Sequence, residues 1–291
     1  MSAADPAWDA VVVGAGPAGL TAATYLARFR RAVLVLHHGP SRAAWIPESH
    51  NTPGFPSGIG GPVLLERLRA QAASFGAELR DGRVEQLTAE AGGFRMEGAF
   101  GVIRSRSVLL ATGVSDRMPP IAGIAAAIRR GLVRLCPICD GFEATGRRLA
   151  VLGDSDFANR EADFLSTYSA DVTVLRLDRS GPASAPGAQH MTLDDLVLEE
   201  AEAVLRSDGR ERRFDHLYLA LGCQPRSDLA IAAGAGQDEL GKLLVDAHQM
   251  TSVPGLYAAG DVVRGLNQIA VGAGEAAIAA TAMHNLLRDP A

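Results

Sequence analysis

The chain has few cysteines, no excess of positive charge and no long uninterrupted apolar run. Three cysteines in 291 residues cannot build the disulfide framework of a small secreted domain, so any cysteine chemistry depends on the one close pair. The formal net charge is −5 and acids and bases are interspersed. The chain therefore lacks the basic surface that attracts nucleic acid or anionic membrane, and we expect neither partner.

No segment has the pattern of a secretory signal or a membrane span. The N-terminal stretch "MSAADPAWDA" lacks the basic start and apolar core of a signal. The most apolar long run, from Gln268 to Met283, contains Glu275 and falls short of the roughly 18 apolar residues that a spanning helix needs. Its many small residues predict a helix packed closely on a neighbour or a cofactor. We expect a cytoplasmic protein.

Two segments share a strand, helix, strand plan. The first runs "DAVVVGAGPAGLTAATYLARF" and continues into "AVLVLHH"; the second is "RRLAVLGDSDFANREADFLSTYSADVTVLRLD", with a helix beginning near Phe157. A length of 291 residues with 47% hydrophobic content is enough for two domains. The predicted fold class is α/β, with two Rossmann-like dinucleotide-binding units.

The segments around these units differ in how clearly they predict structure. Residues 46–62, "IPESHNTPGFPSGIGGP", are too rich in Pro and Gly for regular structure and predict a long loop, whereas "VLLERLRAQAASFGA" has helical spacing. Strands are expected at "SVLLATGVSD", "FDHLYLALG" and "GLYAAGDVV". Between 179 and 213 the pattern is weak, and we expect an irregular or mostly helical stretch.

The first unit carries a nucleotide-binding loop. Gly14, Gly16 and Gly19 form G-x-G-x-x-G directly after a strand and before a helix, where glycines permit a tight turn and close approach of backbone to a pyrophosphate. The second strand of such a unit usually ends in a carboxylate for the ribose, but here it ends in His37 and His38. Neutral imidazole can accept one hydrogen bond, so these are either altered ribose contacts or plain surface residues.

The order of motifs along the chain resembles the low-molecular-weight thioredoxin reductases, two-domain flavoprotein disulfide reductases. The motifs are GAGPAG, Asn51 before Pro-Gly, "ATG" ending at Gly113, "CPICDG" from Cys136, and Gly260-Asp261 followed by Gln268. The resemblance runs nearly end to end. It implies a homodimer, with a discontinuous FAD domain at residues 1–114 and 242–291. Residues 115–241 would form an inserted NAD(P)H-binding-like domain that carries the cysteine pair.

The resemblance also implies the cofactor-binding residues. The GAGPAG loop would take the FAD pyrophosphate, Asn51 would lie beside the flavin, Asp261 would hydrogen-bond the FAD chain, and Gln268 would approach the flavin ring. The family usually has a basic residue where this chain has Asn267. The full set expected at FAD is Gly14, Gly16, Pro17, Ala18, Gly19, His37, His38, Asn51, Val84, Ala111, Thr112, Gly113, Gly260, Asp261, Gln268 and Ile269.

The pair Cys136 and Cys139 is predicted to be redox-active. A four-ligand zinc site needs two more Cys or His ligands, and Cys223 is the only other cysteine. In a C-x-x-C pair one thiol attacks and the other resolves the mixed disulfide, and Asp140 can shuttle the thiol proton if its surroundings raise its pKa. By resemblance, Cys139 faces the flavin and Cys136 meets the substrate disulfide. Cys223 is expected to be a small buried residue.

The second glycine loop departs from the family pattern. It has Asp154 and Ser155 where NADPH-binding relatives have glycine, and the following strand leads to Arg176 and Arg179 with Leu177 and Asp178 between them. Acids beside a pyrophosphate oppose its charge, so we expect no normal NADPH site.

Four functions are therefore compared. The favoured one is an FAD-dependent disulfide oxidoreductase that acts on a thioredoxin-like protein or a small disulfide. The alternatives are a reductase supplied by a ferredoxin-type or other flavin donor, a dithiol oxidase that uses oxygen, and a flavin-binding redox sensor without turnover. Dithiol oxidases commonly have His after the second cysteine, so Asp140 favours the reductase direction.

Overall fold

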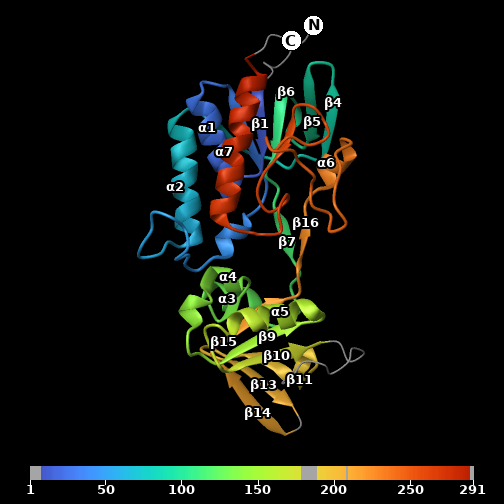
Figure 1. The fold of residues 1–291 in the computed structure, drawn as a ribbon. Coiled ribbons are helices and arrows are strands. Elements are labelled where there is room, and N and C mark those ends of the chain that lie inside the picture. The colour runs from blue at the N-terminus through green and yellow to red at the C-terminus, as the bar shows by residue number, and fades with distance from the viewer. Residues whose placement is uncertain (1–7, 178–188, 208, 289–291) are drawn as a thin grey trace. The chain divides into compact units, whose positions relative to one another are not determined.

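The structure is a computed structural model that describes residues 8–177, 189–207 and 209–288, and it consists of two compact units. The first unit contains the described residues of Met1–Ala44, Gly61–Ser115 and Gln224–Ala291. The second contains Trp45–Gly60 and Asp116–Cys223 (Figure 1). The chain passes between the units at two short strands that pair with each other, β7 (Val114–Asp116) and β16 (Cys223–Pro225).

The first unit is built on a mixed seven-stranded sheet. Five strands run parallel: β3 (Glu78–Asp81), β2 (Val33–His37), β1 (Trp8–Val13), β6 (Gly101–Leu110) and β17 (Leu256–Ala258). An antiparallel hairpin, β5 (Gly93–Gly98) and β4 (Gln86–Glu90), extends the sheet beyond β6. The central β1 is apolar without alternation and is buried along Ala10–Val13, as expected for a parallel strand covered on both faces.

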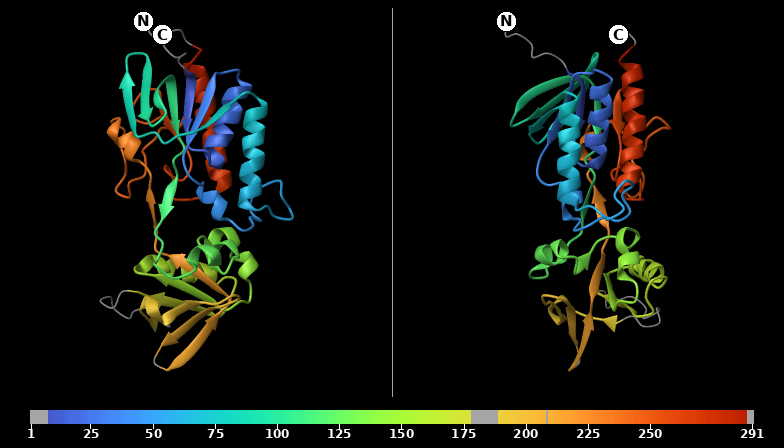
Figure 2. Two further views of the ribbon diagram at one scale, coloured as in Figure 1. Left: turned by 180° about the vertical axis from the view of Figure 1, so that it is seen from behind. Right: turned by 90° about the vertical axis from the view of Figure 1, so that its left-hand side faces the viewer.

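Three helices pack together in the first unit. These are α1 (Pro17–Arg28), α2 (Gly61–Ser74) and α7 (Ile269–Leu286), and α1 lies between the other two in both views of Figure 2. Helix α7 buries Gly272, Ala276, Ala279 and Ala280, whose small side chains permit close packing on α1. The predicted small-residue helix is therefore confirmed. None of the helices in the described ranges is both long and apolar enough to span a bilayer.

The second unit is built on a parallel five-stranded sheet. Its strands, in spatial order, are β11 (Gln189–His190), β10 (Val172–Arg176), β9 (Leu149–Gly153), β15 (His216–Ala220) and β8 (Val133–Arg134). Helix α5 (Asp156–Leu165) packs on β9, β10 and β15. The shorter helices are α3 (Ile124–Arg129), α4 (Pro137–Asp140) and the 3-10 turn η2 (Phe142–Ala144). The predicted second strand, helix, strand unit is confirmed.

The prediction of an irregular or mostly helical stretch between 179 and 213 is wrong. Residues 178–188 lie outside the described chain, but the rest contains an antiparallel sheet of β12 (Leu196–Leu198), β13 (Ala203–Ser207) and β14 (Arg210–Phe214), preceded by a 3-10 turn, η3 (Leu193–Asp195). The dense charge that obscured the strands forms ion pairs across them, including Arg206 with Glu211 at 3.1 Å.

The boundaries of the two units also differ from those predicted. The second unit ends at Cys223 instead of 241, because helix α6 (Asp228–Ala232) and the chain after it bury Ala230, Ala235 and Leu243 in the core of the first unit. The loop after η1 (Arg42–Trp45), predicted as part of the first domain, is grouped with the second unit, where Trp45 packs against the apolar cluster.

Truncating Leu243 tests whether this segment belongs to the first core. Leu243 is 2% exposed within that core, whereas its neighbour Leu244 is 56% exposed. Leu243→Ala should lower the free energy of unfolding by about 2 to 4 kcal/mol, because it loses apolar burial and leaves a cavity. Leu244→Ala is the matched control and should change it by less than about 0.5 kcal/mol. Equal effects in thermal or urea unfolding would contradict this assignment.

Candidate active site

The GAGPAG loop is shaped by backbone packing. Gly14 has φ +113°, and a Cβ there would lie 2.3 Å from the carbonyl oxygen of Ala111. A Cβ on Gly19 would lie 1.9 Å from the carbonyl oxygen of Gly14, so neither position accepts a side chain. Helix α1 starts at Pro17 after an extended Gly16, and its first turn has no acidic residue. Its N-terminal amides and positive dipole end therefore suit a pyrophosphate.

Two further turns meet this loop at the same edge of the sheet. Ala111, Thr112 and Gly113 follow β6, and the Ala111 amide donates to the Val13 carbonyl oxygen at 2.9 Å. Gly260 follows β17 with φ +85°, and a Cβ there would lie 3.0 Å from Ala18. Because carboxyl ends of parallel strands share one edge, three segments distant in sequence form one glycine-lined cradle. These residues fit the diphosphate of FAD.

The Gly260–Asp261 turn is braced by charged residues that the sequence did not single out. Glu275, 5% exposed, accepts a hydrogen bond from the Gly260 amide at 2.8 Å and pairs with Arg264. The Lys242 ammonium donates to the Asp261 carbonyl oxygen. Arg42 lies 3.8 Å from the Asp261 carboxylate. Glu275, the acid within the small-residue run, was the one feature of the sequence that pointed to these contacts. Gln268 and Ile269 sit at the start of α7.

The carboxylate of Asp81 lies beside His37 and His38. His37 closes β2 opposite Asp81 of β3, and His38 Nδ1 lies 3.7 Å from Asp81 Oδ1. Burial, followed by Arg69, lowers the pKa of His37, so its imidazole is neutral at pH 7. Val84 follows β3 and is buried. Asp81 was not predicted beside His38, because the neighbouring strand becomes known only with the sheet order.

Cys136 and Cys139 form a disulfide at the start of helix α4. Their Cα atoms are 5.3 Å apart, and the Cys139 amide donates to the Cys136 carbonyl oxygen at 3.0 Å. Among the described residues no cluster of His, Cys, Asp and Glu is placed to hold a metal ion. Cys223 lies outside this disulfide on β16 and is partly buried, not buried as predicted.

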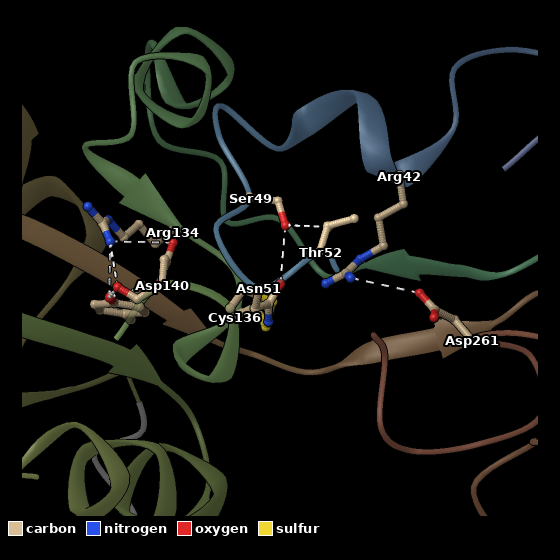
Figure 3. The surroundings of a disulfide bond; sticks show 10 residues. Arg42, Ser49, Asn51, Thr52, Arg134, Cys136, Asp140 and Asp261 are labelled. Atoms are coloured by element: carbon tan, nitrogen blue, oxygen red, sulfur yellow. Dashed lines mark hydrogen bonds and ion pairs between the residues drawn. A yellow bond between two sulfur atoms is a disulfide. The ribbon is translucent and has the colours of Figure 1, made fainter. Parts of the chain in front are cut away.

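Asp140 lies among polar side chains of the second unit. Tyr218 donates its hydroxyl to Asp140 Oδ1 at 3.0 Å, and Arg134 Nη1 lies 3.5 Å from Asp140 Oδ2 (Figure 3). Burial raises the pKa of Asp140 to about 6, and the Arg134 charge followed by the two hydrogen bonds counteracts part of that effect. The carboxyl therefore exchanges protons near neutral pH, as an acid-base group requires.

Asn51 belongs to the same compact unit as the disulfide, not to the unit that contains the glycine cradle. The Ser49 hydroxyl donates to Asn51 Oδ1 at 3.1 Å and lies 2.7 Å from the Thr52 hydroxyl (Figure 3). Ser49 also pairs with Ile59 across the loop. The loop predicted at 46–62 ends at Gly60, because α2 begins at Gly61, and local hydrogen bonds hold it in shape.

Two arginines contact the second glycine loop. Gly153 ends β9, and a Cβ there would lie 2.5 Å from the Cβ of Ala158, so this first glycine serves packing. Asp154 accepts from Arg117 at 3.1 Å. Arg176 Nη1 donates to the Ser155 carbonyl oxygen at 2.8 Å and lies 4.0 Å from Asp156. Arg117 and Arg176 therefore both contact the loop itself. Asp178 and Arg179 lie outside the described residues.

Comparison with known proteins agrees with this architecture. The family model for pyridine nucleotide-disulphide oxidoreductases matches residues 8–196 and 188–277. The thioredoxin reductase of Mycolicibacterium smegmatis is 31% identical over 90% of this chain and 91% of its own. The atypical thioredoxin reductase TRi of Desulfovibrio vulgaris Hildenborough is 35% identical over 97% and 98%, with a TM-score of 0.57.

A third comparison shows the fold alone. The thioredoxin reductase structure from Streptococcus pyogenes MGAS5005 superimposes with a TM-score of 0.87 over 98% of this chain and 99% of that chain, at 24% identity. The family match and the two thioredoxin reductase relatives agree with the glycine cradle and with the disulfide pair that follows it in the sequence. The chain belongs to the pyridine nucleotide-disulphide oxidoreductase family and is an FAD-dependent, thioredoxin reductase-like disulfide oxidoreductase.

Proposed function

We propose that the protein passes an electron pair through Cys136 and Cys139 to the disulfide of a thioredoxin-like protein. The observation that carries this proposal is the disulfide itself, followed directly by a carboxyl whose pKa is raised to about 6. When bound, FAD supplies the electron pair that converts the Cys136–Cys139 disulfide into a dithiol. Gly14, Gly16, Ala111, Gly260 and Asp261 are the residues proposed to hold it.

The exchange with substrate is balanced in electrons and protons. The Cys136 thiolate attacks one sulfur of the substrate disulfide, and the second substrate sulfur leaves as a thiolate. Cys139 then attacks Cys136 in the mixed disulfide, which re-forms the Cys136–Cys139 bond and releases the substrate as a dithiol. Asp140 carries the proton from the Cys139 thiol to the departing sulfur, and the other substrate sulfur takes from solvent the proton that Cys136 released on forming its thiolate. One disulfide is thereby reduced for each pair oxidised.

Exposed apolar residues beside the pair support a protein substrate. Ile138, between the two cysteines, is 50% exposed, and Phe142, just after Asp140, is 75% exposed. Exposed apolar side chains next to a reactive group suit a surface that docks another protein. The matching relatives from M. smegmatis and D. vulgaris are both thioredoxin reductases by name.

We propose further that nicotinamide dinucleotides are poor electron donors. A dinucleotide at the second glycine loop would meet the Asp154 and Asp156 carboxylates, while Arg117 and Arg176 are already engaged by that loop. The site would thus oppose a pyrophosphate more than attract one. A ferredoxin-type protein or another reduced flavin is the donor class that avoids this loop.

Exchanging one cysteine tests the route of the electrons. Cys136→Ser should abolish reduction of oxidised thioredoxin, because no thiolate remains to attack the substrate, while dithionite still bleaches the flavin. Cys223→Ser is the matched control and should keep wild-type turnover. Retained turnover in Cys136→Ser would contradict the route, and loss in both variants would point to a folding defect, which flavin content would reveal.

Anaerobic reduction of the flavin tests the donor. NADPH and NADH should bleach the flavin absorbance at least about 100-fold more slowly than a reduced ferredoxin, since the nucleotide loop is blocked by its own charges. Rapid bleaching by NADPH would reject the proposal about the donor. Hydrogen peroxide released on adding a dithiol in air would instead identify the oxidase direction, and absence of turnover with every donor would favour a redox sensor.

A further inference from the structure

The carboxyl of Asp140 is held by two residues from neighbouring strands. Arg134 ends β8 and Tyr218 lies in the middle of β15, and the register of the two strands places these residues opposite each other. Tyr218 is 1% exposed, and its hydroxyl donates to Asp140 Oδ1 at 3.0 Å. Arg134 Nη1 donates to the Asp140 carbonyl oxygen at 2.9 Å and lies 3.5 Å from Oδ2. Both the backbone and the side chain of Asp140 are therefore fixed.

His216 and the Gly131 carbonyl oxygen hold the Arg134 side chain in place. Its Nη2 lies 3.2 Å from His216 Nε2, and its Nε donates to the Gly131 carbonyl oxygen at 3.2 Å. Because an arginine can only donate, Nε2 must accept, and the Nδ1 proton of His216 goes to the Gly131 carbonyl oxygen at 3.1 Å. Burial and the Arg134 charge lower the pKa of His216 to about 4, so this ring stays neutral.

The charged and hydrogen-bonding side chains that act on Asp140 come from three elements. Arg134 on β8 is the cation, Tyr218 on β15 is a neutral donor whose own pKa is raised by burial, and Glu143 on η2 is an anion that raises the pKa of Asp140. Burial alone favours the protonated carboxyl, whereas Arg134 and Tyr218 favour the carboxylate. The proton affinity of Asp140 thus reflects a balance that depends on these two partners.

We propose that Arg134 and Tyr218 are positioning residues for the disulfide chemistry, which fix the Asp140 carboxyl and set the pH at which it exchanges its proton. This inference rests on the proposed role of Asp140 as the proton carrier. Without the Arg134 charge the buried carboxyl would stay protonated at neutral pH. A protonated carboxyl cannot accept the proton of a thiol. Without the Tyr218 hydroxyl the same change would occur to a smaller extent.

The direct test is the titration of Asp140 itself by carbon-13 NMR of the oxidised holoenzyme labelled at aspartate carboxyls. The resonance is assigned by its loss in Asp140→Asn. Arg134→Met should raise the pKa of Asp140 by about one pH unit or more, because it removes the opposite charge. Tyr218→Phe should raise the pKa by less, since it removes one hydrogen bond and keeps the ring. Arg134→Lys keeps the positive charge, so it should bring the pKa of Asp140 most of the way back to the wild-type value.

Tyr168→Phe is the matched control. The Tyr168 ring lies beside Gly141, next to Asp140, so this variant alters another tyrosine of the same region. It should leave the Asp140 titration unchanged. An unchanged titration in Tyr218→Phe overturns the inference, even if Arg134→Met fails to fold.

A pH–rate profile separates this inference from the proposed function. With thioredoxin as substrate, the limb that Asp140→Asn removes should move to higher pH in Tyr218→Phe and Arg134→Met. If Asp140→Asn leaves the profile unchanged, the proton-carrier role fails, and the inference fails with it even where the NMR titration shifts. If Asp140→Asn removes the limb while the other two variants leave it in place, the inference fails and the proposed function stands.

Discussion

The parallel packing of strands is the constraint on which both units depend. In the first unit, β1, β6 and β17 end at one edge, so the GAGPAG loop, the Ala111–Gly113 turn and the Gly260–Asp261 turn must share one small space. That space is filled by backbone, which is why Gly14 and Gly19 accept no side chain. A cradle made of amides and one helix N-terminus is the arrangement that a diphosphate requires.

The second unit repeats this plan but uses it differently. In the loop after β9, Asp154 accepts a hydrogen bond from Arg117, and the Ser155 carbonyl oxygen accepts one from Arg176. The neighbouring strands β8 and β15 instead supply Arg134 and Tyr218 to the carboxyl that follows the cysteine pair. We propose that this unit serves the disulfide and its proton more than a nucleotide.

Patterns of neighbouring residues predicted most helices, strands and loops. The features that the sequence did not predict depend on contacts between residues far apart in the chain. The glycine loop, the small-residue helix α7 and the cysteine pair follow from spacing along the chain. The strands β12 to β14 were missed because their charges pair across strands, and Asp81 was missed because it reaches His38 from an adjacent strand. The partners of Asp140 lie 6 and 78 residues away, so only the register of β8 and β15 brings them together.

The unit boundary illustrates the same point. Residues 224–245 lie next to the second unit in sequence but bury Ala230 and Leu243 in the first core. Burial in one core or the other decides such a boundary, and a sequence shows only that the residues are apolar.

Cys136 is the thiol that we propose meets the substrate. Trapping of the mixed disulfide tests this proposal most directly. The reduced Cys139→Ser holoenzyme is mixed with an oxidised thioredoxin and analysed by non-reducing electrophoresis and peptide mass spectrometry. A stable adduct joined through Cys136 is expected, because no resolving thiol remains. An adduct that forms only in Cys136→Ser, through Cys139, would contradict it.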